Sequence, residues 1–216
     1  MSGRGRPRSE EAHRAILAAV VELLPEQGLD GLTIEAVAAH AGVGKTTIYR
    51  RWDTKNELIL EAIEQLRPPG PPPDTGSLIG DLNALVAVQR ERLEASQLPR
   101  VIPRVLAESL DDPDLHTQIM ERAVKPIRGI LEQIVRRAID RGELREDLDV
   151  ETTVDTLHGS AVYSLLMARG ALEAVSGVPE RVVPLLLEGV SSSSGARASA
   201  RRRSSGSSRA RPARSG

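Results

Sequence analysis

The segment from Thr33 to Lys55 constrains the fold more than any other part of the chain. Thr33 has the short hydroxyl side chain that caps a helix N-terminus, and apolar residues follow it at helical spacing. Gly42 then supplies the left-handed backbone conformation that a tight turn needs, and a second short helix is predicted from Gly44 to about Arg51. The segment therefore predicts two short helices joined by a turn, a helix-turn-helix.

The second helix of such a motif can lie in the major groove of DNA. Arg and Lys can bind guanine, and the methyl group of Thr can contact the methyl group of thymine. We expect Tyr49 to pack its ring inward with its hydroxyl group on a phosphate, and Lys55 to contact a phosphate as well. For any single Lys or Arg, the alternative is an ordinary solvated charge. The predicted DNA-binding residues of this segment are Thr33, Gly44, Lys45, Thr46, Thr47, Tyr49, Arg50 and Lys55.

The residues available for a core favour helices. Hydrophobic residues make up 40% of the 216 residues, but aromatic residues make up only 1%, and Phe is absent. A core of Leu, Val, Ile and Ala suits helix packing better than a β-sandwich. Apolar residues recur at helical spacing from Ser9, the expected cap of the first long helix, to about Val190. The predicted fold class is all-α, with a helix-turn-helix head joined by a connecting helix to a helical body.

Several classes of site are excluded by the residues present. The chain has no Cys, which excludes disulfides and Cys-ligated metals. Its four His residues are scattered, and no nucleophile has a base placed beside it. Gly44-Lys45-Thr46 matches the end of a phosphate-binding P-loop, but Ala39 stands where the first Gly is required, and the preceding segment is helical. We therefore expect no enzyme, no metal site and no cofactor.

No targeting segment is apparent. The N-terminal arginines are followed by no apolar run, so we expect no signal peptide. No stretch reaches the roughly 18 apolar residues of a membrane span. The expected protein has no membrane partner and is cytoplasmic.

Composition divides the chain into four parts and a linker. Residues 1–8 are predicted to be a disordered basic arm, 9–58 the DNA-binding domain, 59–190 the helical regulatory and dimerisation domain, and 191–216 a disordered tail rich in Ser and Arg. The Pro-rich run 67–76 cannot be helical and is read as the linker. Counted along the sequence, the arm and the head together (residues 1–58) are neutral, the body carries a charge of -8, and the tail +7.

The two basic ends are candidates for further DNA contact. The segment from Gly3 to Arg8 resembles the core of an AT-hook, in which Arg side chains lie in a narrow minor groove. The alternative is a basic tail that only increases solubility. The candidate residues are Arg4, Arg6 and Arg8.

Within the body, helix boundaries follow Pro, Gly and Asp. Asp111, Asp112 and Pro113 indicate the start of a long helix that should be kinked or divided at Pro126. The last two helices are predicted from Asp149 to about Arg169 and from Pro179 to about Val190.

Residues 9–58 resemble the DNA-binding head of the TetR family of bacterial transcriptional repressors. Two residues depart mildly from the family pattern: Trp52 stands where Phe is usual, and Val37 where Ile is usual. The resemblance covers about the first quarter of the chain and is carried by Gly28, Leu29, Thr33, Ile34, Val37, Ala38, Ala41-Gly42-Val43, Gly44-Lys45, Thr47-Ile48-Tyr49, Arg50, Trp52, Lys55, Glu57 and Leu58.

The resemblance implies a three-helix head, a fourth connecting helix, and a body that dimerises and holds a ligand. The protein is then expected to be a repressor that binds a palindromic operator as a homodimer and is released, through the fourth helix, by a small-molecule effector. The alternative is an architectural DNA-binding protein that uses its Arg-rich tails without sequence specificity or effector. The candidate effector-binding residues are His116, Met120, His158, Tyr163 and Met167.

The last two helices are more apolar than the surface of a monomer tolerates. In the family, these two helices pair with their copies in a second subunit. Gly159, Ser160, Ala161 and Ser164 would allow two helices to approach closely. The candidate dimer-interface residues are Leu157, Ala161, Leu165, Val183, Leu186 and Leu187.

Overall fold

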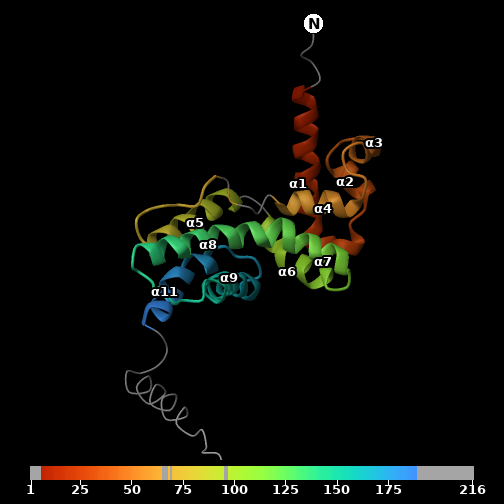
Figure 1. Cartoon of the computed structure of the whole chain (residues 1–216). Coiled ribbons are helices and arrows are strands. Elements are labelled where there is room, and N and C mark those ends of the chain that lie inside the picture. The colour runs from red at the N-terminus through yellow and green to blue at the C-terminus, as the bar shows by residue number, and fades with distance from the viewer. Residues whose placement is uncertain (1–5, 65–67, 69, 95–96, 189–216) are drawn as a thin grey trace, which may run out of the picture.

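The chain folds into helices joined by turns throughout residues 6–64, 68, 70–94 and 97–188, which are the residues that the computed structural model describes. No strand occurs among them, so the all-α prediction is confirmed. Four helices form the head in Figure 1: α1 (Arg6–Gly31), α2 (Ile34–His40), α3 (Lys45–Tyr49) and α4 (Lys55–Glu64).

The body follows the head in sequence and lies to one side of it (Figure 1). Its elements are α5 (Leu78–Leu93), α6 (Leu98–Ser109), α7 (Pro113–Ile119), the π-helical segment η1 (Met120–Val124), α8 (Lys125–Asp140), α9 (Val150–Met167), α10 (Glu173–Ser176) and α11 (Val178–Glu188). The short α10 was not predicted. None of the described helices is long and apolar enough to cross a membrane.

Local sequence signals set several helix ends as expected. The hydroxyl oxygen of Thr33 accepts the backbone N–H of Ala36 at 3.1 Å and caps α2. The turn after α2 places Gly42 at φ 65°. The carboxylate of Asp149 accepts the N–H of Thr152 at 2.7 Å and caps α9. These caps satisfy backbone groups that a helix end otherwise leaves unpaired.

The start of α1 differs from the prediction. The helix begins at Arg6, so Ser9 lies inside it and is not its cap. The hydroxyl and carbonyl oxygens of Ser9 both accept from the guanidinium of Arg51, each at 2.5 Å. The end of the helix was predicted better, because Gly28 breaks it with φ 75° and ψ 179°.

Pro126 divides the long body helix as predicted, and the break begins one turn earlier. Proline lacks an N–H, and its ring clashes with the carbonyl four residues before it in a regular α-helix. The wider turn of η1, which ends just before Pro126, avoids this clash between α7 and α8.

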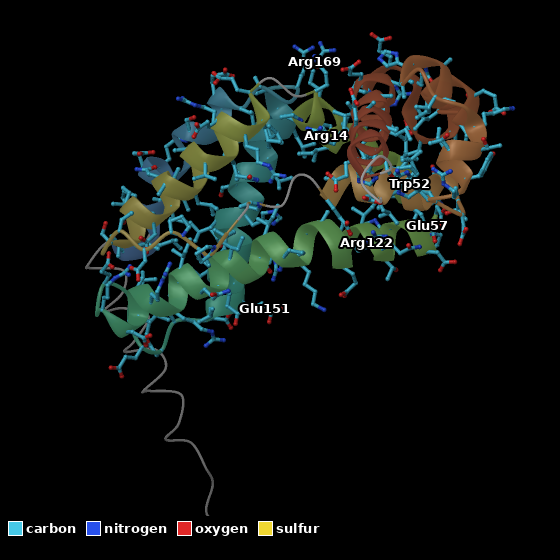
Figure 2. The ribbon with its side chains drawn as sticks, turned by 90° about the horizontal axis from the view of Figure 1, so that it is seen from above. Arg14, Trp52, Glu57, Arg122, Glu151 and Arg169 are labelled. Carbon is cyan, nitrogen blue, oxygen red and sulfur yellow. The ribbon has the colours of Figure 1, made fainter. Side chains whose placement is uncertain are left out.

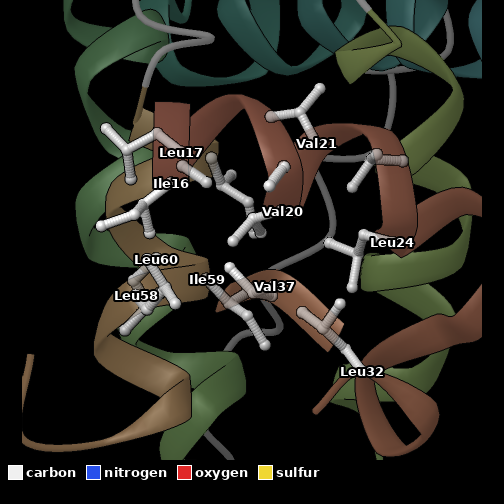
Figure 3. Packing of buried hydrophobic residues seen from close by; sticks show 14 of the residues in the cluster. Ile16, Leu17, Val20, Val21, Leu24, Leu32, Val37, Leu58, Ile59 and Leu60 are labelled. Carbon is white, nitrogen blue, oxygen red and sulfur yellow. The ribbon is translucent and has the colours of Figure 1, made fainter. Parts of the chain in front are cut away.

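The core of the head is aliphatic and continues into the body. Ile16, Val20 and Leu24 of α1 pack against Val37 of α2 and Ile59 of α4, and all five are almost fully buried (Figure 3). The same cluster includes buried residues of α6, α7 and η1. The head therefore rests on these body elements through a continuous hydrophobic contact.

A second cluster holds the remainder of the body together. It joins α5, α8, α9 and α11 through residues such as Leu82, Ile134, Val154 and Val183. Leu, Ile, Val and Ala supply both clusters apart from Trp52, as the near absence of aromatic residues requires.

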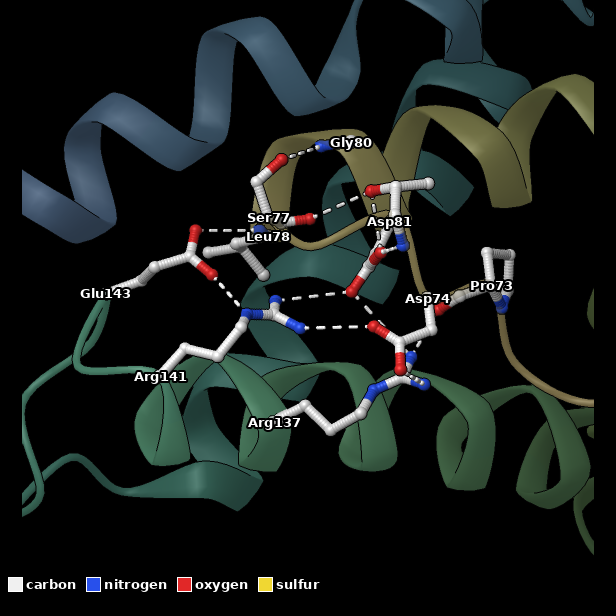
Figure 4. Close-up of polar contacts among 10 residues, drawn as sticks. Pro73, Asp74, Ser77, Leu78, Gly80, Asp81, Arg137, Arg141 and Glu143 are labelled. Carbon is white, nitrogen blue, oxygen red and sulfur yellow. Dashed lines mark hydrogen bonds and ion pairs between the residues drawn. The ribbon is translucent and has the colours of Figure 1, made fainter.

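The described part of the Pro-rich segment is not helical, and its end is fixed to the body by a buried carboxylate (Figure 4). Asp81 is fully buried and accepts the N–H and the hydroxyl group of Thr75 at 2.5 and 2.8 Å. Arg137 and Arg141 of α8 form ion pairs with the same carboxylate at 3.7 and 3.3 Å. Burial raises the pKa of Asp81, but the hydrogen bonds from Thr75 and the pairing with Arg141 outweigh it and hold the pKa below its ordinary value.

Candidate nucleic-acid interface

The second helix of the helix-turn-helix exposes cations and hydroxyl groups. Ile48 of α3 is fully buried and, with the buried Trp52 after it, orients the helix on the head core. Gly44, Lys45, Thr46 and Arg50 are exposed, and Thr47 is half-buried. The predicted residues of this helix are thus brought together on its outer surface, where they can enter a groove of DNA.

The prediction for the ring of Tyr49 was wrong. Its side chain is 53% exposed and does not pack inward. Ile48 takes the core-facing position, and one residue of helix turns the next side chain by about 100°. The ring of Tyr49 is therefore part of the outer surface, where both the ring and its hydroxyl group can contact the sugar-phosphate backbone of DNA.

Lys45 makes an ion pair that DNA binding would replace. Its ammonium group donates to the carboxylate of Glu35 on α2 at 2.8 Å, and both side chains are more than half exposed. The hydrogen bond from Lys45 holds the pKa of the Glu35 carboxyl below its ordinary value. Exposed pairs of this kind contribute little to stability, so a phosphate or a guanine can displace the carboxylate.

The two residues predicted to contact phosphates differ in their surroundings. Thr33 is exposed, and its hydroxyl group keeps a donor while its oxygen caps α2. Lys55 is half-buried, and its ammonium group donates to the carbonyl of Leu29 at 2.7 Å. This contact holds the start of α4 on the end of α1, and it leaves Lys55 two further N–H donors for a phosphate.

The structure alters the expected shape of the N-terminal arm. Arg4 lies outside the described residues, as does the tail 191–216. The backbone at Arg6 and Arg8 belongs to the first turn of α1 and is not extended. An AT-hook conformation at these two residues would require this turn to unwind.

Three residues outside the predicted set of DNA-binding residues fix the position of α3. Arg51 ties the end of α3 to Ser9 of α1. The indole N–H of Trp52 donates to Glu61 at 2.6 Å, and its ring stacks on His13 with centroids 5.3 Å apart. A buried Trp needs an acceptor for its indole N–H, and this requirement could have predicted a polar partner such as Glu61. For His13 and Arg51, the sequence holds no comparable signal.

A polar junction connects the body to the end of α1. Arg104 of α6 donates to the carbonyls of Pro25 and Glu26 at 2.9 and 2.8 Å and to the carboxylate of Glu108 at 2.6 Å. Glu108 in turn accepts the N–H of Leu29 at 2.5 Å. We call Arg104 and Glu108 the α6 clamp, because together they hold the end of α1, which leads into the helix-turn-helix.

The body contains a cavity of about 190 Å³ between α5, α6, α8, α9 and α10. Its walls are mostly aliphatic, with His158 among the polar exceptions. Burial, and then the charge of Arg128, lowers the pKa of His158 below its ordinary 6.5, so its imidazole is neutral at pH 7. A neutral imidazole can both donate and accept a hydrogen bond.

Of the five residues predicted to bind an effector, His158 alone lines this cavity. His116 forms a hydrogen bond of 3.1 Å between its ring and the hydroxyl of Ser109, and Met120 packs against the head-side cluster. Tyr163 and Met167 are 64% and 63% exposed on the outer face of α9. The periodicity of α9 was correct, but the side of the helix that carries the cavity depends on its packing partners.

Most of the predicted dimer residues also lie on the inner side of their helices. Leu157, Ala161 and Leu165 line the cavity. Val183 is buried and Leu186 packs against the body core, which leaves Leu187 of this set on the surface with 53% exposure. Five of the six residues therefore face the cavity or the core of the monomer, and the exposed surface of these helices lies on their opposite sides.

Comparison with known proteins gives matches along most of the chain. The family model described as bacterial regulatory proteins, tetR family, matches residues 16–62, and the model for the tetracyclin repressor-like C-terminal domain matches residues 72–186. An uncharacterised HTH-type transcriptional regulator of Bacillus subtilis, YdeS, is 36% identical over 171 residues, which are 77% of this chain and 84% of that protein.

Two further relatives are informative. The DNA-binding transcriptional repressor TetR of Mycobacteroides abscessus is 31% identical over 162 residues, covering 74% of this chain and 85% of that protein. The crystal structure of the transcriptional regulator FadR from Bacillus subtilis in complex with stearoyl-CoA is 21% identical, with a TM-score of 0.69 over 83% of this chain and 100% of that one. At this identity, the FadR structure supports the fold alone.

Proposed function

Because the chain belongs to the TetR family of DNA-binding transcription regulators, we propose that it represses transcription by binding a palindromic operator as a homodimer and that a small molecule releases it. The observation that carries this proposal is the outer surface of α3, which presents Lys45, Thr46, Tyr49 and Arg50 around a helix held in place by buried residues. The action as a repressor is supported by the repressor TetR of Mycobacteroides abscessus.

Dimerisation is assigned to the outer surface of α9 and α11. Tyr163 and Met167 of α9 and Leu185 and Leu187 of α11 are all more than half exposed. Gly159 lies exposed on the same side of α9, where the lack of a side chain permits close approach of a second helix. A two-fold dimer formed through this surface carries two copies of α3, as a palindromic site requires.

Release by an effector is supported by the cavity and the α6 clamp. Ile102 of α6 lines the cavity, and Arg104 and Glu108 of the same helix hold the end of α1. An effector that binds better to a body with α6 displaced shifts the heads away from their DNA-bound spacing, in proportion to its preference for that state. FadR of Bacillus subtilis, which shares the fold, holds stearoyl-CoA in its crystal structure.

The test is the loss of operator binding in Lys45→Ala. The operator is first located by footprinting the DNA upstream of the gene, and affinity is measured by fluorescence anisotropy at moderate salt against a scrambled duplex. The substitution removes a base contact of about 1–3 kcal/mol from each half of the operator, so we expect an affinity loss of at least about 30-fold on the operator only. The matched control is Lys125→Ala, because Lys125 forms the same kind of exposed pair with Glu121 at 2.8 Å.

Two results would contradict the proposal. One is an unchanged operator affinity in Lys45→Ala. The other is wild-type binding that is equal on operator and scrambled DNA and depends only on salt, which would indicate an architectural protein.

A further inference from the structure

The aliphatic cavity adjoins a second, open depression of about 820 Å³, which we call the arginine groove. Both are lined by Arg90, Leu93, Pro99 and Leu172, so the two spaces share a wall. The groove lies between the ends of α1 and α5, the start of α6, and the turn that follows α9. A ligand that occupied both would therefore have an apolar part and a separate polar part.

The arginine groove is positively charged within an acidic body. It is lined by Arg90, Arg100, Arg104 and Arg169 and by two acidic residues, Glu94 and Glu173, so the charges of its lining sum to +2. Among the described residues, Arg90, Arg100 and Arg169 are exposed and form no ion pair. Guanidinium groups gathered without acidic partners repel one another, and an anion with several acceptor oxygens relieves this repulsion. The first turn of α6 also opens on the groove, and the positive end of a helix favours an anion.

Arg169 occupies a backbone position where glycine is favoured. It is the only non-glycine residue of the described chain with positive φ, at 54°. Its N–H bonds the carbonyl of Leu166 and the next N–H bonds that of Leu165, which is the hydrogen-bond pattern of a Schellman cap. In the equivalent caps of α2 and α8, the corresponding residues are Gly42 and Gly142. An Arg in this position carries a conformational cost, and such costs gather at functional sites.

The turn that carries Arg169 is held closely against α6. A Cβ atom on Gly170 would lie 2.8 Å from the backbone of Arg100, so this close approach requires glycine. It brings Arg169 and Arg100 to the same part of the groove. Figure 2 shows Arg169 on the side of the body that faces α1.

The cavity limits the size of the apolar part. An engineered cavity of about 150 Å³ binds benzene, which has six carbon atoms. A cavity of about 190 Å³ therefore accommodates an apolar group of roughly six to eight carbons. The groove is several times larger than one carboxylate requires, which favours a bulky head with several negative charges.

We propose that the effector of this protein is an amphipathic anion, with a medium-length acyl tail in the cavity and a phosphate-bearing head in the arginine groove. The proposal rests on the effector-controlled function above and specifies the ligand class. Octanoyl-CoA is the probe that carries both parts. Octanoate tests a carboxylate head, CoA tests the head without a tail, and octanol tests the tail without charge.

Binding is measured by isothermal titration of the full-length protein. We expect octanoyl-CoA to bind at least about tenfold more tightly than CoA, octanoate or octanol, and more tightly than stearoyl-CoA, whose tail exceeds the cavity. Octanoate binding as tightly as octanoyl-CoA would overturn the phosphate-bearing head, and octanol binding as tightly would overturn the anionic class. Stearoyl-CoA binding more tightly would overturn the tail length.

Two variants assign the binding to this site. Arg169→Gly should weaken octanoyl-CoA binding about tenfold, while its melting temperature stays equal or rises, because glycine relieves the positive φ. Ala161→Leu, which fills part of the cavity, should weaken octanoyl-CoA but leave CoA unchanged. The control Arg136→Ala removes an exposed arginine of α8 that is paired with Glu132.

These measurements separate the ligand class from the function. Each variant is also tested for operator binding in the absence of ligand, which Arg169→Gly should retain. Unchanged octanoyl-CoA affinity in Arg169→Gly would overturn the inference while the operator result stands. Failure of the wild type on its operator would instead overturn the proposed function.

Discussion

At the scale of single residues, Gly28 holds a backbone conformation that a side chain would strain. Its φ of 75° and ψ of 179° fall in a region that glycine alone adopts readily, and an added Cβ would lie 2.5 Å from the guanidinium of Arg104. Gly28→Ala should therefore lower the free energy of unfolding by about 2–3 kcal/mol, measured by urea denaturation.

The control for Gly28→Ala is Gly129→Ala in α8. Gly129 is helical, and a Cβ atom added to it would meet nothing within 4 Å, so alanine should raise the free energy of unfolding by about 0.5–1 kcal/mol. Equal effects of the two substitutions would show that the backbone at Gly28 is not restrained as the structure indicates.

Residues whose role depends on their immediate neighbours were predictable from the sequence. Thr33 as a cap and Gly42 in the turn follow from side-chain chemistry and allowed φ values, and both are confirmed. The predictions for Ser9 and Tyr49 were wrong. α1 starts before Ser9, because tertiary contacts can stabilise an earlier first turn. Tyr49 is exposed, because Ile48 occupies the core position. Such outcomes depend on the packing of distant segments.

At the scale of elements, hydrophobic periodicity located the helices of the body but did not assign their faces. α9 carries large apolar or aromatic side chains on both sides, with Leu157 and Leu165 inward and Tyr163 and Met167 outward. Its face toward the core was decided by the positions of α5, α8 and α11. Of the residues predicted for the interface, Leu157, Ala161 and Leu165 therefore line the cavity in the monomer, and Leu187 lies on the surface.

The α6 clamp gives an element-scale prediction through Glu108. Burial raises the pKa of its carboxyl, but hydrogen bonds from Arg104 and Leu29 outweigh burial and hold the pKa below its ordinary 4.5. Glu108→Gln removes the charge but keeps an acceptor. It should lower the free energy of unfolding at pH 7 by about 1–2 kcal/mol, because hydrogen bonds to a charged group are the stronger ones.

The pH dependence of this difference follows from the direction of the pKa shift. A depressed folded-state pKa stabilises the protein fully above pH 4.5, and the stabilisation is lost as the pH falls through the folded-state value. The difference between wild type and Glu108→Gln should therefore shrink below pH 4.5. Glu132→Gln, at an exposed pair with Arg136, should change stability by less than about 0.5 kcal/mol. A Glu108→Gln effect that persists unchanged in acid would contradict the charge-based explanation.

At the scale of the whole molecule, the arrangement of head and body keeps the acidic body away from the DNA-binding surface. The arm and the head together (residues 1–58) are neutral, and the body carries -8, counted over residues 59–190. Figure 1 shows α3 at the far side of the head from α9 and α11, so the acidic body is held away from a DNA duplex bound at α3. Affinity then depends on individually placed donors of α3 more than on a general positive field.

The dimer surface gives the prediction at this scale. Tyr163 is 64% exposed beside Gly159 and Ser160 in an open depression between α9 and α11. In a two-fold interface each copy of Tyr163 lies near the axis or is buried against the partner, so Tyr163→Arg would bury a charge without a partner. We expect the variant to sediment as a monomer in analytical ultracentrifugation at micromolar concentration and to lose operator affinity, because one head contacts only half of a palindrome.

Leu110→Arg is the control, since Leu110 is 69% exposed outside α9 and α11 and its substitution should leave the dimer intact. A Tyr163→Arg protein that remains dimeric would place the interface elsewhere, and the spacing of the two α3 helices would then have to arise from a different face of the body.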